Sequence, residues 1–501
     1  MKLYRTLFLI LALSIIVCDV QAQRGNVWCF GDSAGIDFKN GVIPITSLVA
    51  GRGSCVSICD SYGSMLFYAA TMIYSNNYFP KSTMVFDETN SLMLNGDSIK
   101  GTNWYKELVI VPMPGDSMKY YLFSIGVTSG PGFSYSIIDM SQNGGLGAVI
   151  QKNVPLESFK AVDCMEAVKH ANGRDWWIAI RDAATSNNEH RIYLVSPSGI
   201  SLPIVQNVGS VNSLNTGRYS FSPDGSKVAF INYWGLFELY DFDRCTGIVS
   251  NPLTIHPEPT ALPIRSLWSC EFSPNGRFLY VTASSDTSYL YQYDLQSPNP
   301  ASTRLTLATN TDQTHAMGQI RRGPDDKIYL STWYLCPVSP YCYPYPDSVY
   351  NTINSNLGVI NFPDSLGIAC GYLPYSFNLG GKRTYIGLPN NPDYDLPALA
   401  GSPCDTLVSQ NELAGAAAVG SLHVYYHTAW EKAFINASNL KGKTGKLLVY
   451  DMQGKVVHSE PLRIQNGYYT RDLSMIGFAK GMYLITIQTE KERLTKKMMV
   501  E

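Results

Sequence analysis

Short apolar runs broken by turn residues recur at a regular interval along most of this chain. Three turns rich in Pro, Asp, Asn and Gly precede apolar runs such as KVAFIN and FLYVTA. The prolines of these turns, Pro223, Pro274 and Pro324, lie 51 and 50 residues apart. Proline fixes φ, and Gly, Asn or Asp supplies the left-handed conformation that many hairpins need. The pattern therefore predicts a repeat of about 50 residues built on strand–turn–strand units.

The same signature extends upstream through Gly63, Gly115 and Gly173, each followed by another apolar run. Three or four short strands per repeat is the plan of a β-propeller blade, whose faces are covered only by neighbouring blades. The repeats of a β-solenoid are usually shorter, which makes that fold the weaker alternative. Residues 24–395 have room for seven repeats. We therefore predict an all-β fold with a seven-bladed β-propeller, and six or eight blades are the alternatives.

Closure of the ring needs strands from the two ends of the repeat region. Gly371–Phe377 is similar to an innermost strand, so we assign it to a seventh blade. We expect Asn26–Phe30 to add an outer strand to the blade made by the last repeat.

The N-terminus has the pattern of a secretory signal peptide. A basic start is followed by an apolar run over residues 7–17 and by small residues before Gln23. The run is shorter than the ~20 residues that a membrane-spanning helix needs. We therefore assign residues 1–22 to a signal peptide cleaved after Ala22. Cys18 raises a lipoprotein alternative, but the bulky Val17 before it departs from a lipobox.

Eleven cysteines are present, and removal of the signal peptide takes one of them. An even number in an exported chain is compatible with disulfides. We predict a small disulfide loop between Cys336 and Cys342. Cys55 and Cys59 would be roughly 13 Å apart on one strand, beyond the reach of a disulfide, so buried free thiols are expected there.

The C-terminal region differs from the repeats in composition. Residues 396–420 are rich in Pro, Gly and Ala and are predicted to be a linker. Residues 421–501 alternate apolar and polar positions around a turn at Asp451–Gly454, which predicts a small Ig-like β-sandwich. From residue 441 onward there are 11 Lys and Arg residues and 6 acidic ones. This basic surface either protects edge strands or docks on a secretion component.

Two regions of the chain resemble known families. Trp28–Phe38, Cys59–Tyr68 and Asn378–Pro389 resemble the N-terminal propeller of secreted proteins of gliding and related Bacteroidota, for which no shared activity is established. The C-terminal region is similar to the type A C-terminal sorting domain of the type IX secretion system. The matching motif residues are Asp451, Gly454, Gly481, Tyr483, Lys496 and Lys497.

The second resemblance implies export through the type IX translocon, with the translocon and its sortase as partners. It also implies a secreted or outer-membrane surface-attached protein that loses its sorting domain. Such domains often begin with a Tyr-Pro-Asn-Pro-like segment, whereas this chain has Tyr425–Thr428, which leaves the start near 421 open.

Composition and motifs argue against nucleic-acid binding, a membrane-spanning segment and the common catalytic motifs. The formal net charge of −2 gives no basic surface for nucleic acid, and no membrane-length apolar run follows the signal peptide. The seven histidines form no zinc motif, and no nucleophile elbow or phosphate loop is recognisable. Neither a catalytic residue nor a metal site is therefore assigned. Asp393 and Asp395 could ligate calcium, although a turn-rich segment explains them better.

Propeller geometry places a candidate binding site where the innermost strands begin, around one mouth of the central channel. The charged, polar and aromatic residues at these positions are Trp104, Tyr105, Lys106, Glu107, Lys160, Asp163, Arg218, Arg265, Trp268, His315 and Gln319. They could bind a polar or carbohydrate-like ligand, or they could simply solvate the channel rim. A structural ion pair between Lys106 and Glu107 is expected in preference to acid–base chemistry.

The sequence favours an exported, non-enzymatic binding or interaction module. The first alternative is a lactonase-like hydrolase or lyase, metal-assisted, acting at the channel mouth. The second is a structural or adhesive component of the cell surface.

Overall fold

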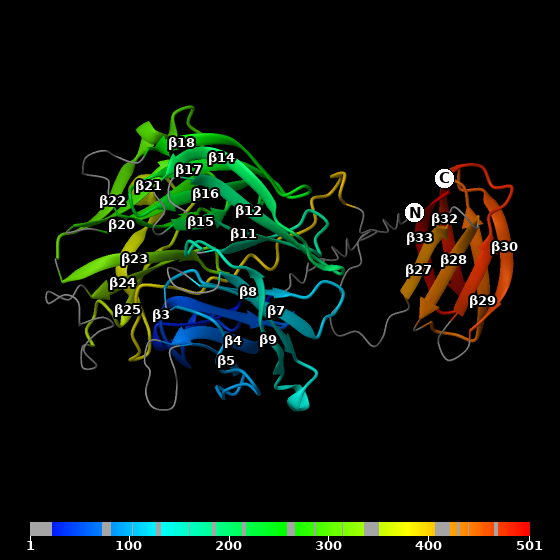
Figure 1. Ribbon diagram of the computed structural model, residues 1–501, viewed down its shortest axis with the longest axis horizontal. Coiled ribbons are helices and arrows are strands. Elements are labelled where there is room, and N and C mark those ends of the chain that lie inside the picture. The colour runs from blue at the N-terminus through cyan, green and yellow to red at the C-terminus, as the bar shows by residue number, and fades with distance from the viewer. Residues whose placement is uncertain are drawn as a thin grey trace, which may run out of the picture. The chain divides into compact units, whose positions relative to one another are not determined.

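The structure is a computed structural model of the 501-residue chain. It describes residues 23–500 except 73–81, 103, 127–131, 160, 183–186, 213–216, 258–265, 285–286, 313, 335–349, 406–420, 428–430, 439 and 465–468. The proposed signal peptide and cleavage point at Ala22 lie outside this range. The chain divides into two compact units between Ser409 and Gln410. Each unit is described by itself (Figure 1).

Five consecutive antiparallel sheets make up most of the first unit, four of them with four strands and one with five, in chain order from the innermost outward. The first sheet contains β6 (Leu108–Pro112), β7 (Lys119–Ile125), β8 (Phe133–Asp139) and β9 (Ala148–Glu157). The second contains β10 (Glu166–Lys169), β11 (Trp176–Ile180), β12 (Asn187–Ser196) and β14 (Ile204–Asn212), and the short β13 (Gly199–Ile200) also pairs with β12. The third sheet contains β15 (Gly217–Phe221), β16 (Lys227–Asn232), β17 (Phe237–Asp243) and β18 (Ile248–His256). The fourth contains β19 (Leu267–Phe272), β20 (Phe278–Ser284), β21 (Ser288–Asp294) and β22 (Leu305–Asn310). The fifth contains β23 (His315–Arg322), β24 (Ile328–Tyr334), β25 (Asn356–Ile360) and β26 (Tyr372–Asn378). Three short 3-10 helices, η1 (Asn143–Gly145), η2 (Pro300–Thr303) and η3 (Gly367–Cys370), lie in connections.

The N-terminal strands complete the ring in an unexpected way. They are β1 (Val27–Phe30), β2 (Asp32–Asp37), β3 (Ile43–Cys59), β4 (Met65–Met72) and β5 (Thr83–Asp87). The 17-residue β3 pairs with β2 up to Ala50 and with β4 from Gly51 onward. With β3 counted in both halves, the described strands of this unit form seven antiparallel sheets. The predicted seven-bladed propeller is confirmed.

Apolar clusters fill the spaces between neighbouring blades, as a propeller requires. Phe230, Tyr219 and Val168, for example, join the blades of β10 and β15. The ring closes because Trp28 and Phe38 of the N-terminal sheet pack edge-on against Tyr329 of β24, with ring centroids 5.6 Å apart in both pairs. The repeated sheets therefore shield one another around a shared axis.

Two details of the predicted closure are wrong. Gly371–Phe377 is not an innermost strand, because β26 pairs with β25 as the outer strand of the last sheet and leaves several side chains exposed. The innermost position there belongs to β23, whose first six residues are buried. Asn26–Phe30 does not add an outer strand to that blade either. β1 pairs with β2 instead, because the Gly31 turn joins the two as a hairpin.

Residues 383–405, hereafter the strap, connect the two faces of the ring. Ile386 packs with Tyr105 and Trp268 where innermost strands begin. Further along, the side-chain amide of Asn390 donates to the carbonyls of Leu108 and Met165, which belong to two different blades. The strap then reaches the turn face, which is the face where the innermost strands end.

A disulfide holds the end of the strap. It joins Cys404 to Cys245, between β17 and β18. The strap therefore continues beyond residue 395, the predicted end of the propeller. Described strand cysteines such as Cys55 and Cys59 are free and buried, as expected.

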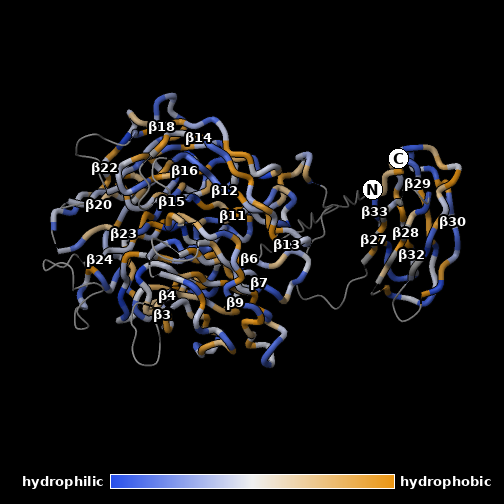
Figure 2. The backbone as a smooth tube through the Cα atoms, viewed as in Figure 1, coloured by the Kyte–Doolittle hydropathy of each residue, from blue (hydrophilic) through white to orange (hydrophobic). Residues whose placement is uncertain are grey.

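The second unit is a β-sandwich, and this prediction is confirmed. One sheet holds β27 (Ser421–His427), β28 (Lys432–Ser438) and β31 (Tyr469–Ser474). The other has the order β30 (Val456–Arg463), β29 (Thr444–Tyr450), β32 (Gly481–Thr489) and β33 (Arg493–Val500). Apolar side chains such as Leu447 and Ile485 form the core between the sheets. The mixed colours along these strands in Figure 2 reflect the alternation of apolar and polar residues in the sequence.

Candidate functional site

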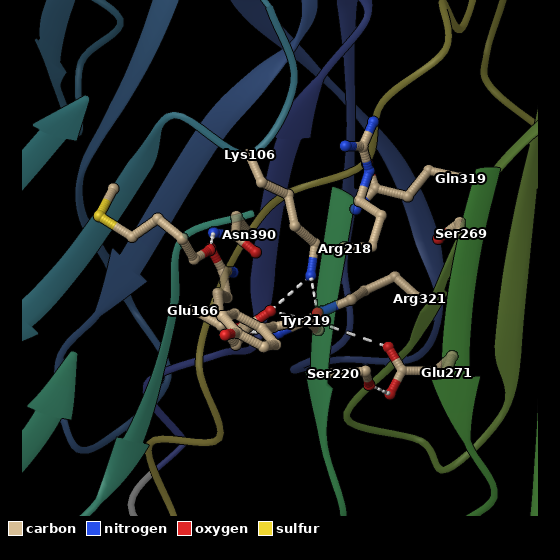
Figure 3. A network of polar contacts seen from close by, with 12 residues as sticks. Lys106, Glu166, Arg218, Tyr219, Ser220, Ser269, Glu271, Gln319, Arg321 and Asn390 are labelled. Atoms are coloured by element: carbon tan, nitrogen blue, oxygen red, sulfur yellow. Dashed lines mark hydrogen bonds and ion pairs between the residues drawn. The ribbon is translucent and has the colours of Figure 1, made fainter. Parts of the chain in front are cut away.

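A buried network of charges occupies the middle of the propeller axis (Figure 3). Lys106 lies 2.5 Å from Glu166 and also donates to the carbonyl of Tyr219 over 2.6 Å. Arg321 lies 3.5 Å from Glu166 and 3.6 Å from Glu271. We call Lys106, Glu166, Glu271 and Arg321 the axial network.

The axial network is electrically balanced and well connected. Two cations face two carboxylates, and Arg321 also donates to the carbonyl of Asn391 in the strap. Lys106 and Glu166 are each 2% exposed. Buried charges are tolerated when they are paired and hydrogen-bonded in this way. Lys106 therefore acts as a structural residue, and its expected pair with Glu107 is corrected to a pair with Glu166.

A second cluster, rich in aromatic rings, lies at the face where the innermost strands begin, as expected from the sequence. We call its seven residues the aromatic mouth: Arg52, Trp104, Tyr105, Arg218, Tyr233, Trp268 and Trp333. They come from β3, the segment before β6, β15, the end of β16, β19 and β24.

The rings of the mouth pack against one another around Trp268. Its centroid lies 4.9 Å from that of Tyr105, and 6.1 Å from those of Tyr233 and Trp333. The guanidinium of Arg218 lies over both Tyr105, at 4.9 Å, and Trp268, at 5.5 Å. Arg52 is placed in the same way over Trp104, at 5.0 Å. Such cation–π contacts hold arginines beside aromatic faces without neutralising their charge.

Two carboxyl groups contact residues of the mouth. Asp163 is 3.3 Å from Arg218, and burial raises the pKa of Asp163. Glu107 accepts hydrogen bonds from Thr102 and from the Trp104 amide, and burial raises the pKa of Glu107 to about 7. Because Glu107 orders the segment that carries Trp104, its contacts are those of a positioning residue.

The mouth has a buried floor and a partly exposed rim. Tyr105, Arg218 and Trp268 are between 3% and 9% exposed. Arg52 and Trp104 are only partly buried, and Trp234 beside the rim is 36% exposed.

Three residues of the mouth were not identified from the sequence, namely Arg52, Tyr233 and Trp333. Tyr233 and Trp333 lie at or just after the ends of second strands. Second strands return to the face where the innermost strands begin, so this topology could have identified both rings.

The other predicted site residues make different contacts or lie outside the mouth. His315 contacts Asp312 at 3.0 Å and Thr314 at 2.7 Å at the start of β23. Lys160, Arg265, Cys336 and Cys342 lie outside the described residues. In the second unit, Asp451 accepts hydrogen bonds from the amides of Gln453 and Lys455. This contact forms the turn that contains Gly454, at φ 79°.

The remaining motif residues of the second unit lie on its last two strands. The buried Tyr483, in β32, donates to the carbonyl of Ala479 over 2.8 Å. Gly481 begins β32, and Lys496 and Lys497 lie on β33.

A groove of about 530 Å³ opens on the turn face. The turn prolines Pro223, Pro274 and Pro324 line it together with the strap, and Glu166 and Arg321 also contribute. Within it, burial and the neighbouring Asp393 raise the pKa of Asp395 to about 7. Among the described residues, no group of three His, Cys, Asp or Glu side chains is arranged to hold a metal ion.

Comparisons with known proteins give a family match for the second unit. Residues 430–501 match the family described as the secretion system C-terminal sorting domain. The chain therefore carries a type IX sorting domain and is exported to the cell surface or released. No curated protein matches the chain. In the described part of the chain, no helix has both the length and the apolar character for crossing a membrane.

Several solved structures are similar to the chain at low identity. One is a protein from Bacteroides fragilis assigned provisionally as a 6-phosphogluconolactonase, with 13% identity and TM-score 0.42, covering 66% of this chain and 89% of that one. Another is the β-propeller domain of Cps50 (Swd1) from Myceliophteria thermophila, with 10% identity, TM-score 0.37 and coverage of 63% and 97%. A third is a quinonprotein alcohol dehydrogenase-like protein from Bacteroides thetaiotaomicron, with 9% identity, TM-score 0.36 and coverage of 73% and 76%.

Proposed function

We propose that the propeller is an exported binding module whose aromatic mouth receives a polar, carbohydrate-like ligand. One observation carries this proposal: three tryptophans, two tyrosines and two arginines from separate blades converge where the innermost strands begin. Flat rings offer apolar area to the faces of a sugar, and a few placed polar groups fix its orientation. The partly exposed Trp104 is the ring best placed to make the first contact.

The second unit accounts for the export of the propeller. The sorting domain takes the folded propeller across the outer membrane, and we propose that residues 421–501 are then removed. A chain truncated before residue 421 should remain in the periplasm, with its surface level falling to background in cell fractionation. Truncated protein at normal surface levels would contradict the assignment of the sorting signal.

Hydrolysis or elimination at the mouth is the second candidate. It is favoured by one observation, the Glu107 carboxyl with a pKa of about 7, which suits a general acid or base. However, Glu107 is fully buried and accepts from Thr71, Thr102 and the Trp104 amide, which occupy its oxygens. Binding without turnover therefore has the stronger support.

The test is binding of purified mature propeller to a glycan array, followed by calorimetric titration of the best ligand. Trp104→Ala should weaken binding about tenfold, because a stacked ring contributes roughly 1–2 kcal/mol, while the melting temperature stays unchanged. Tyr62→Ala, an exposed aromatic on the turn face, is the matched control and should bind as wild type. Absence of binding to every glycan, or equal loss in both variants, would contradict the proposed function.

A further inference from the structure

Several buried donors around the floor of the aromatic mouth lack an acceptor among the described residues. Within the described part of the chain, the Trp268 Nε1, Arg218 Nε and Gln319 Nε2 groups make no hydrogen bond, and the two carboxyl oxygens of Asp163 accept none. Trp268 is 9% exposed, and Arg218 and Gln319 are 3% and 2% exposed. A buried donor left unpaired costs about 1–3 kcal/mol, so native proteins usually supply a partner such as water, an ion or a ligand.

These donors belong to one neighbourhood. The guanidinium of Arg218 lies over the Trp268 ring at 5.5 Å. The Gln319 amide accepts from the backbone of Leu388 through its oxygen, and its backbone N–H donates to Ile386, a residue in the same apolar cluster as Trp268. All three groups can only donate at the atoms concerned. The missing partner of these donors must therefore offer an acceptor atom, such as the oxygen of a water molecule, a sugar or an anion.

The charges around the mouth favour the same kind of partner. Arg52 and Arg218 belong to the mouth, and Arg181 lies close by, because its carbonyl accepts from Val162, the residue before Asp163. Arg181 is fully buried, and its guanidinium lies over the Phe230 ring at 4.3 Å. Opposite these three cations are Asp163 and Glu107, and burial raises the pKa of both carboxyls. Burial therefore disfavours negative charge at both carboxyls, which lie near the guanidinium groups of the mouth.

We propose that the aromatic mouth selects anionic ligands and that a carboxylate or sulfate group of an acidic saccharide binds between Arg218 and Trp268. This inference rests on the proposed function, because the rim must first hold the saccharide. The anionic group accepts hydrogen bonds from Trp268 Nε1 and Arg218 Nε, and the aromatic rim excludes water from these bonds. Charge-assisted bonds to a guanidinium are stronger than neutral ones and give discrimination against uncharged analogues.

The experiment compares matched ligands on the mature propeller. The glycan array carries neutral, uronate-containing and sulfated oligosaccharides, which distinguishes the two sources of negative charge. Titration then uses hexagalacturonate and its methyl ester, or the leading sulfated glycan and its desulfated form. The acidic form should bind at least tenfold more tightly, and its affinity should fall as salt rises from 50 to 500 mM.

A conservative variant separates hydrogen bonding from ring contact. Trp268→Phe keeps an aromatic ring and removes the Nε1 donor, so it should weaken binding of the acidic form about tenfold and leave the uncharged form unaffected. Trp176→Phe is the matched control, since Trp176 is also buried but packs edge-on against Tyr394 of the strap. It should bind as wild type.

The outcomes distinguish the two proposals. If acidic and uncharged forms bind equally, or if Trp268→Phe keeps the full preference for the acidic form, the anionic selectivity is wrong and buried water satisfies these donors. The proposed function would still stand in that case. If no saccharide binds, the proposed function itself falls, and the inference falls with it.

Discussion

The axial network and the aromatic mouth are both built from charged residues near the propeller axis, yet they differ in how completely those charges are used. Lys106 and Arg321 each contact carboxylates and a backbone carbonyl. In the mouth, Arg218 contacts one carboxylate at 3.3 Å and donates to the carbonyls of Asp163 and Gly217, but its Nε has no partner among the described residues. Saturated charges stabilise a fold, whereas unsaturated donors beside exposed rings indicate a place for a ligand.

The path of the strap is consistent with a mouth at only one face of the ring. The strap binds the axial network through the Asn391 carbonyl and two neighbouring blades through the Asn390 side chain. The strap thereby runs past the axial network to the turn face, and the mouth lies at the other face, where the innermost strands begin. The first test of this division is to disturb the network and measure whether the mouth changes.

Glu166→Leu should have the largest effect. It leaves Lys106 without its carboxylate in a buried site, which typically costs about 3–5 kcal/mol. Denaturant unfolding of the mature propeller measures the loss. The double variant Lys106→Met/Glu166→Leu should recover most of it, because both charges are then gone. Equal stability of Glu166→Leu and wild type would show that the network is not structural.

Replacement of Cys245 and Cys404 by serine should cause the second-largest loss of stability. The disulfide joins residues 159 positions apart in sequence, and such crosslinks typically contribute about 2–4 kcal/mol. The melting temperature should fall, while affinity at the mouth stays unchanged because the crosslink fixes the end of the strap on the turn face. A loss of binding without a loss of stability would contradict the separation of the two regions.

Asp395→Asn should have the smallest effect, and its sign depends on pH. The folded pKa is raised from 3.8 to about 7, so the fold favours the protonated acid. Its contribution is fully present below pH 4 and is lost as pH rises through 7. The full shift would correspond to about 4 kcal/mol, but Asp395 lines an open groove where solvent screens its charge. The variant should therefore be more stable than wild type at pH 8 by on the order of 1 kcal/mol, and equal to it near pH 4. Thermal melts at both pH values check this, with the exposed Asp326→Asn as control.

Much of the fold could be predicted because the turns that separate its strands are formed by residues close together in sequence. The turns at Pro223, Pro274 and Pro324 each set one blade, so their spacing reveals the repeat. The long β3 could not be predicted in the same way, since no turn marks the change of partner between Ala50 and Gly51. Cys245 and Cys404 are too far apart in sequence for spacing to suggest their pairing.

The candidate site was predictable in part for the same reason. Trp104, Arg218 and Trp268 stand at the starts of innermost strands, and the structure brings them together. Lys106 and His315 occupy similar positions in sequence but face other partners, Glu166 and Asp312. Alternation along a strand says which side a residue faces, but only the assembled ring decides which neighbour it meets.

The most direct measurement is a crystal structure of the mature propeller with a bound acidic oligosaccharide. We expect the sugar to lie against Trp104, with its acidic group between Arg218 and Trp268 and the axial network unchanged. A sugar found in the groove of the turn face, with the aromatic mouth closed by its own side chains, would contradict the assignment of the mouth as the binding site.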